Sequence, residues 1–153
     1  MIRILTVLAT IVFALPAAAQ SLIGCQGWQG HAQAIPEPWE NHTRTFSNGN
    51  VRVALLDTIE PANGAFYLLI LTPPFDELGG RTCEIIAEGD GQQGFNGLFF
   101  DQLEASYDPA TGLTLRVPVS RFLWQTSETA MATLAVTINQ ATGDIFPRFD
   151  DFR

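Results

Sequence analysis

The chain has 153 residues, 46% hydrophobic and 16% charged, and a formal net charge of −8. This composition is typical of a folded domain and not of a disordered tail. The acidic charge argues against binding to nucleic acid or to anionic lipid, because both require concentrated basic residues. All eight basic side chains are arginine, which indicates arginine-rich codon usage and a bacterial source.

Residues 1–19 show the order of parts found in a secretory signal peptide. Arg3 supplies the positive charge, residues 4–15 form an apolar run, and residues 17–19 are alanines that offer a cleavage site. The apolar run is too short for a membrane-spanning helix, which needs about 20 residues. We therefore expect cleavage after residue 19 and a single secreted β domain at residues 20–153, located in the periplasm or outside the cell.

The stretch LIGC at residues 22–25 allows two interpretations of Cys25. It matches a lipobox, whose cysteine would be acylated and would anchor the protein to a membrane as a lipoprotein. Acylation would, however, leave Cys83 as an odd thiol in an oxidising compartment. A disulfide between Cys25 and Cys83 removes this difficulty and closes a loop of about 60 residues, which stabilises the fold by about 4 kcal/mol. We predict the disulfide, and the lipid anchor is the alternative.

Within the secreted domain, residues 20–42 form a polar, proline-containing N-terminal segment that we expect to lie over the sheet. Residues 43–145 form the β core, where period-two patterns of apolar residues predict strands. The run AFYLLILT at residues 65–72 is apolar on both faces, as in a central strand. The clearest alternation occurs at residues 113–120 and 132–139. Turn sequences such as SNGN, DPATG and NQATGD favour tight antiparallel connections between the strands.

The predicted fold is all-β and mainly antiparallel, because the gaps between strands are too short for several helical crossovers. We expect a single small barrel or sandwich of about six or seven strands, with a β-meander in the C-terminal half. Pro118 cannot donate a ladder hydrogen bond, so its strand should be an edge strand or bulge there. One short helix is expected near residues 121–130, where three consecutive large apolar residues interrupt the alternation. Residues 146–153 form a tail.

The sequence predicts no metal site and no cofactor. His31 and His42 lie in the N-terminal segment with glutamates nearby, but their spacing matches no zinc motif, and prolines exclude a helix that would gather the ligands. The glycine-rich loop at residues 88–99 fails as an EF-hand, because Phe99 occupies the position of the bidentate glutamate.

No catalytic residue stands out in the sequence. There is no GxSxG motif, and neither histidine has a neighbouring motif that nominates a serine or cysteine partner. Asp101 and Glu104 were considered as a glycosidase pair, but three residues apart on a strand they would point to opposite faces. We therefore expect no enzymatic activity, and a small hydrolase without a recognisable motif is kept as an alternative.

The aromatic residues offer the remaining clue to function. They either cap the open ends of a small β domain, or Phe122 and Trp124 form a weak candidate binding surface, since tryptophan is favoured in binding hot spots. The leading hypothesis is a non-catalytic binding or envelope accessory domain. Its partner would be an unidentified small ligand or an envelope protein.

Overall fold

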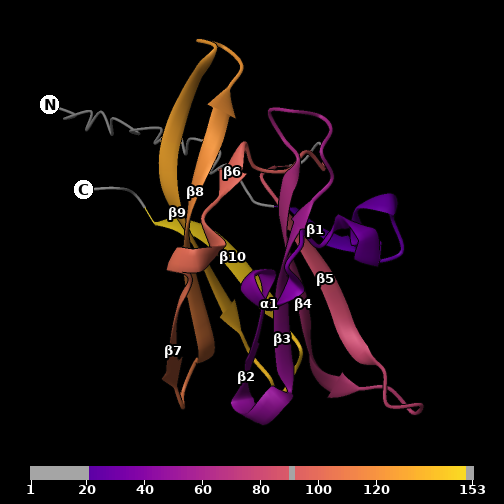
Figure 1. Ribbon diagram of the computed structural model, residues 1–153. Coiled ribbons are helices and arrows are strands. Elements are labelled where there is room, and N and C mark those ends of the chain that lie inside the picture. Colours follow the sequence, from indigo (N-terminus) through magenta and orange to yellow (C-terminus); the bar gives the residue numbers. More distant parts are fainter. Residues whose placement is uncertain (1–20, 90–91, 151–153) are drawn as a thin grey trace, which may run out of the picture.

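The computed structural model describes residues 21–89 and 92–150 (Figure 1). The expected signal peptide at residues 1–19 lies outside the described residues. Within them the chain forms ten strands in two five-stranded sheets, and every strand pair is antiparallel. The all-β, mainly antiparallel fold is therefore confirmed. There are more strands than the six or seven expected, because the N-terminal segment and residues 146–150, taken for a tail, also pair with the sheets.

The first sheet has the strand order β1-β5-β4-β3-β2. Its strands are β1 (Ser21–Gly24), β2 (Thr43–Phe46), β3 (Val51–Asp57), β4 (Phe66–Phe75) and β5 (Arg81–Ala87). β4 lies at the centre of the sheet and contains most of the run that is apolar on both faces. Both of its faces are covered, which is why this strand lacks the alternation of a half-exposed one.

The second sheet has the order β10-β9-β8-β6, and β7 pairs with β8 further along the same strand. Its strands are β6 (Gly97–Leu98), β7 (Glu104–Asp108), β8 (Gly112–Leu123), β9 (Glu128–Ile138) and β10 (Ile145–Asp150). Strands β7 to β10 follow one another through short turns, which confirms the C-terminal meander. The tip of the β8–β9 hairpin projects beyond the ends of the other strands (Figure 1).

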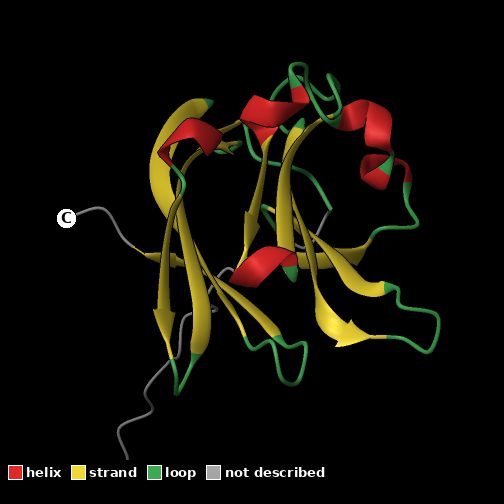
Figure 2. Cartoon of the chain, turned by 60° about the horizontal axis from the view of Figure 1, so that its bottom comes forward, coloured by secondary structure: helices red, strands yellow, loops and turns green. Residues whose placement is uncertain are grey.

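The two sheets pack face to face and enclose one main core, so the fold is a sandwich (Figure 2). β8 contributes alternate residues to this core, from Leu113 to Val119, and the predicted face of that strand is therefore the buried one. β3 and β4 supply the opposite wall with residues such as Val53 and Leu68. Close packing of these aliphatic side chains accounts for most of the apolar area removed from water.

A disulfide links Cys25, directly after β1, to Cys83 in β5, as predicted. The bridge holds the N-terminal segment over the outward face of the first sheet. There Ala34 closes a second, smaller apolar cluster with residues of the sheet such as Leu56 and Tyr67. The segment thus supplies the cover that makes both faces of β4 buried.

In residues 21–89 and 92–150, five short helices lie in the connections between strands, and Figure 2 shows them in red. They are η1 (Trp28–Gly30), η2 (Ala32–Ala34), α1 (Trp39–His42), η3 (Ser47–Gly49) and η4 (Phe100–Gln102). None of the described helices is long and apolar enough to cross a membrane.

The helix expected near residues 121–130 is absent, and that prediction is wrong. β8 continues to Leu123, a turn follows, and β9 begins at Glu128 directly opposite Leu123. Ser127 adopts a φ of 58°, and the backbone N–H groups of Thr126 and Ser127 donate to the carbonyl of Leu123, which closes the turn. The hairpin here extends past the other strands, so the core no longer imposes alternation on the sequence.

Pro118 lies in the interior strand β8 and not in an edge strand, which corrects that expectation. The carbonyl of Pro118 accepts a hydrogen bond from the N–H of Phe99. In an antiparallel strand the nitrogen and the carbonyl of one residue point to the same side, so the ring nitrogen of Pro118 also faces the segment that contains Phe99. On that side pairing is interrupted between β6, which ends at Leu98, and β7, which begins at Glu104. In the described part of the chain, no strand opposite Pro118 on this side offers a carbonyl that would need its N–H as a donor. The missing N–H is therefore tolerated.

Candidate functional site

Strand alternation divides the side chains of β8 and β9 into a core-facing set and an outward-facing set. Leu115 and Val117 point into the core, so the residues between and beyond them point outward. The strand register extends this pattern to β9, where Thr133 lies opposite Pro118. We call the outward surface the outer face of β8–β9. It comprises Arg116, Pro118 and Phe122 of β8, Thr129, Met131 and Thr133 of β9, and Trp124 directly after β8; Ser120 points to the same side but is buried.

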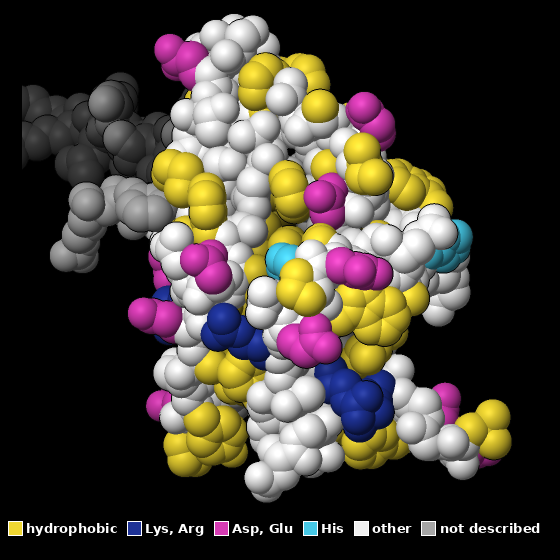
Figure 3. Space-filling view, viewed as in Figure 1, with side chains coloured by type: hydrophobic (Ala, Val, Ile, Leu, Met, Phe, Trp, Pro, Cys, Tyr) yellow, Lys and Arg dark blue, Asp and Glu magenta, His cyan; other side chains and the backbone are white. Residues whose placement is uncertain are grey.

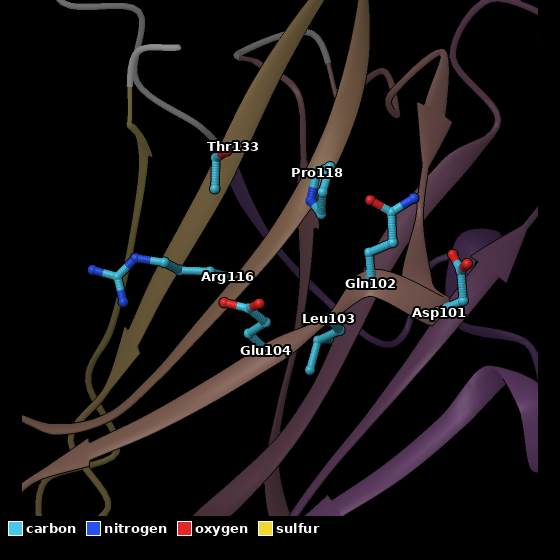
Figure 4. A pocket seen from close by; sticks show the side chains of 7 residues that line it. All are labelled: Asp101, Gln102, Leu103, Glu104, Arg116, Pro118 and Thr133. Carbon is cyan, nitrogen blue, oxygen red and sulfur yellow. The ribbon is translucent and has the colours of Figure 1, made fainter. Parts of the chain in front are cut away.

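A hollow of about 580 Å³ lies on this face, beside the interruption between β6 and β7 (Figure 4). One wall comes from η4 and the start of β7, and the floor comes from β8 and β9. The polar groups that line it are the carboxylates of Asp101 and Glu104, the amide of Gln102, the guanidinium of Arg116 and the hydroxyl of Thr133. Leu103 and Pro118 are its apolar members.

The single arginine in the hollow, Arg116, forms an ion pair with Asp150. Its Nε lies 3.4 Å from Oδ2 of Asp150, and Glu104 lies directly opposite Arg116 in the β7–β8 register. Figure 4 shows the Glu104 carboxylate near the base of the Arg116 side chain, whose guanidinium extends away from it. The Arg116–Asp150 pair is exposed, with 42% and 37% of the two side chains accessible, so it contributes little stability. The hollow therefore carries a small acidic excess.

Asp101 and Glu104 line the same hollow, which corrects the expectation that they would face apart. The reason is local: Asp101 lies in the 3-10 helix η4 and not in a strand, so the alternation argument does not apply to it. The two carboxylates do not converge on one point. Figure 4 shows Glu104 directed toward β8, whereas Asp101 projects from the far end of η4. The arrangement suits contacts to an extended ligand better than acid–base attack on a single bond.

Farther along the outer face of β8–β9, toward the tip of the hairpin, lies an aromatic pair. Phe122 and Trp124 lie with ring centroids 4.6 Å apart and planes at 79°, an edge-to-face contact. Trp124 is 61% exposed, and Met131, next along the face toward the hollow, is also exposed. The structure thus brings the two predicted residues together on one exposed surface.

Sequence reasoning missed the residues that flank this pair. Met131 is seven residues from Trp124, and only the β8–β9 register places it near Phe122, opposite Ser120. Gln102 gave no signal because an exposed glutamine in a connection looks like any polar loop residue. The alternation of β8 did contain a usable signal, since it assigns Arg116 to the outward face.

A second hollow, of about 490 Å³, lies beside α1, β2 and η4. Glu40, His42, Arg44 and Asp101 line it. Nδ1 of His42 lies 3.0 Å from the carbonyl oxygen of Pro36, and the guanidinium of Arg44 donates to the backbone carbonyl of Asp101 and packs on the Phe100 ring. The lining includes no serine or cysteine, so it offers no side-chain nucleophile for a His-activated mechanism.

Metal-ligating residues do not gather in the described ranges. Among residues 21–89 and 92–150, no three His, Cys, Asp or Glu side chains are placed to hold one ion. His31 lies exposed between η1 and η2, whereas His42 ends α1, so the two histidines belong to different elements.

At the projecting end of the sandwich, Arg121 of β8 connects the two sheets. Its Nε lies 3.1 Å from Oε1 of Glu88, directly after β5, and its guanidinium lies 4.2 Å from the centre of the Phe149 ring. Burial raises the pKa of Glu88, and Arg121 offsets part of this rise by its charge and its hydrogen bond. Nearby, burial raises the pKa of Tyr67, whose hydroxyl donates to the carbonyl of Gln92.

The face seen in Figure 3 mixes acidic, apolar and uncharged side chains and shows no extended basic surface. No protein-family model, curated protein or solved structure matches the chain.

Proposed function

We propose that this protein is a non-catalytic binding domain of the bacterial periplasm or cell exterior that holds its ligand on the outer face of β8–β9. One observation carries the proposal: the half-buried ring of Phe122 and the exposed ring of Trp124 lie on the same strand face as a hollow with hydrogen-bonding side chains. Exposed tryptophan beside placed polar groups is a common composition of binding surfaces. The divergent carboxylates of the hollow favour binding over catalysis.

The Cys25–Cys83 disulfide supports a location outside the cytoplasm, because such bonds persist in oxidising compartments. It also argues against the lipoprotein alternative, since one sulfur cannot carry both a disulfide and a thioether. Intact mass of the protein purified from its bacterial host separates the two. A chain that starts at residue 20 and lacks two hydrogens supports the disulfide, and a diacylglyceryl group on Cys25 establishes the lipid anchor.

The proposed function is tested by NMR with isotopically labelled protein and a panel of neutral oligosaccharides, extended peptides, fatty acids and nucleotides. The proposal expects at least one class to shift amide signals of β8 and β9 selectively. It is overturned if every ligand that binds shifts signals elsewhere, or if none binds. Trp124→Ala should leave the melting temperature within about 2 °C of the wild type. A large loss of stability would instead make Trp124 a structural residue.

A small hydrolase is the second candidate function, and the second hollow is the observation that favours it. There the backbone carbonyl of Pro36 accepts a hydrogen bond from Nδ1 of His42 in one tautomer, which leaves Nε2 free to accept a proton. Glu40 and Asp101 line the same hollow. A panel of chromogenic esters, phosphates and glycosides tests this candidate. Turnover that His42→Gln abolishes would establish it, and activity that survives His42→Gln would exclude this hollow as the source.

A further inference from the structure

Taking the proposed function as its basis, we infer that the outer face of β8–β9 binds a neutral, elongated carbohydrate, a polysaccharide or an oligosaccharide of several units. Three features of the face carry this inference: aromatic rings at one end, a mixed set of donors and acceptors at the other, and the distance between them.

The aromatic end suits the apolar face of a sugar ring. The rings of Phe122 and Trp124 meet edge to face, so the contact occupies only one face of one ring. Phe122 is half-buried, whereas 61% of Trp124 is accessible to solvent, so the indole ring is the part of the pair that a ligand can reach. The C–H groups of a pyranose form a flat apolar patch that can stack on such a ring, whereas the sugar hydroxyls remain at its rim.

The hollow suits those hydroxyls. A hydroxyl both donates and accepts hydrogen bonds, so its binding site needs both kinds of partner. The amide of Gln102 and the hydroxyl of Thr133 each do both, the carboxylate of Glu104 accepts, and Arg116 donates. A ligand with only acceptors or only donors would leave part of this lining unpaired.

The charge of the face favours a neutral ligand over an anionic one. Asp150 lies between two arginines, with Oδ2 3.4 Å from Nε of Arg116 and Oδ1 2.9 Å from Nε of Arg148, so it offsets only part of their positive charge. Asp101 and Glu104 add negative charge to the hollow. Nucleic acids and acidic polysaccharides are therefore disfavoured.

The spacing of the face favours several sugar units over one. Arg116 and Phe122 occupy outward positions six residues apart on the same strand, which corresponds to about 20 Å at 3.3 Å per residue. Only an extended molecule contacts the hollow and the aromatic pair at the same time. A single monosaccharide reaches one end and loses the contribution of the other.

The experiment is affinity electrophoresis of the disulfide-intact protein in native gels that contain a soluble β-glucan, a xylan, a galactomannan or an α-glucan. At least one neutral polymer should retard the protein, and its longer oligosaccharides should bind more tightly than its monosaccharide in calorimetry. Trp124→Ala and Glu104→Gln should each weaken binding by about tenfold or more. Trp39→Ala is the matched control, because Trp39 is similarly exposed, at 52%, but lies on α1 away from this face. This control should bind like the wild type.

The inference is overturned if no neutral polymer retards the protein, or if Trp39→Ala weakens binding more than Trp124→Ala. The NMR panel keeps this failure distinct from failure of the proposed function. If peptides shift the signals of β8 and β9 and carbohydrates do not, the carbohydrate inference is wrong and the binding function stands. If nothing shifts them, both are wrong.

Discussion

Replacing Arg121 by alanine removes the side chain that links the two sheets at the projecting end of the sandwich. The wild-type guanidinium pairs with Glu88 at 3.1 Å and lies over the ring of Phe149 at 4.2 Å. Only 25% of the Arg121 side chain and 15% of the Glu88 side chain are accessible to solvent. The substitution therefore leaves the Glu88 carboxylate largely buried and without its counter-charge.

The expected loss of stability follows from these contacts. A hydrogen bond to a charged group contributes about 1.5–3 kcal/mol, and a cation–π contact contributes about 0.5–2 kcal/mol. Because both partners keep some solvent access, water replaces part of what is lost. We therefore expect the free energy of unfolding to fall by about 2–3 kcal/mol at neutral pH, a large part of the about 5–15 kcal/mol typical of a domain.

The pH dependence of this loss identifies its cause. Burial already raises the pKa of Glu88, and Arg121 opposes that rise, so removing Arg121 raises the pKa further. A carboxyl whose pKa is raised by folding adds stability below its unfolded pKa of about 4.3, and this stability is lost as the pH increases through the folded pKa. The difference in the free energy of unfolding between the wild type and Arg121→Ala should therefore become smaller as the pH falls from about 7 to about 4.

Urea unfolding at several pH values measures this prediction, with Arg116→Ala as the matched control. Arg116 makes an exposed ion pair, 42% and 37% accessible, so its removal should cost less than about 1 kcal/mol, with little dependence on pH near neutrality. The reasoning is refuted if Arg121→Ala loses no more stability than Arg116→Ala. It is also refuted if the deficit grows as the solution becomes more acidic.

Three further outcomes are expected from other parts of the sandwich. Replacing Cys25 and Cys83 together by serine should lower the free energy of unfolding by about 4 kcal/mol, because the bridge spans 58 residues; an unchanged urea midpoint would contradict this. Ile59 is 77% exposed with a φ of 69°, unfavourable for a β-branched residue, so Ile59→Gly should raise stability by about 0.5–1 kcal/mol, whereas Ile59→Val should not. In a Tyr107→Phe variant, Tyr67 is the only tyrosine, and burial raises its pKa. Stability linked to Tyr67 persists below about pH 10 and is lost as the pH rises through the folded pKa, so tyrosinate absorbance should appear only above about pH 10, and its appearance below that would count against burial.

Much of the fold could be predicted because the core imposes a local rule on the sequence. Residues 113–119 of β8 alternate between the core and the outer face, and the printed sequence shows this alternation directly. The disulfide could also be predicted, since two cysteines in an oxidising compartment have one intramolecular pairing. At residues 121–130 the prediction failed, because beyond Arg121 the β8–β9 hairpin extends past its neighbours and residues 124–129 are exposed. The core therefore imposes no period-two pattern on this part of the sequence.

The candidate site was only partly visible in the sequence. Phe122 and Trp124 could be selected as aromatic residues, but not the hollow that lies on the same face. Asp101 and Glu104 were assigned to opposite faces by a strand rule that does not hold in a 3-10 helix. Gln102 and Met131 reach the same face only through pairing between segments distant in the chain.

The sequence by itself thus determined the composition, the period-two strands and the turns between them, and it favoured the pairing of Cys25 with Cys83 over a lipid anchor. The strands and turns follow from local sequence patterns, and the cysteine pairing follows from there being only two cysteines in the sequence. The tertiary structure alone decided the sandwich, the cover over the first sheet and the shared face of Arg116 and Trp124. Such features depend on the strand register and on where the pairing of strands stops. Neither can be recognised from a short stretch of sequence, because exposed positions accept many residue types at little cost in stability.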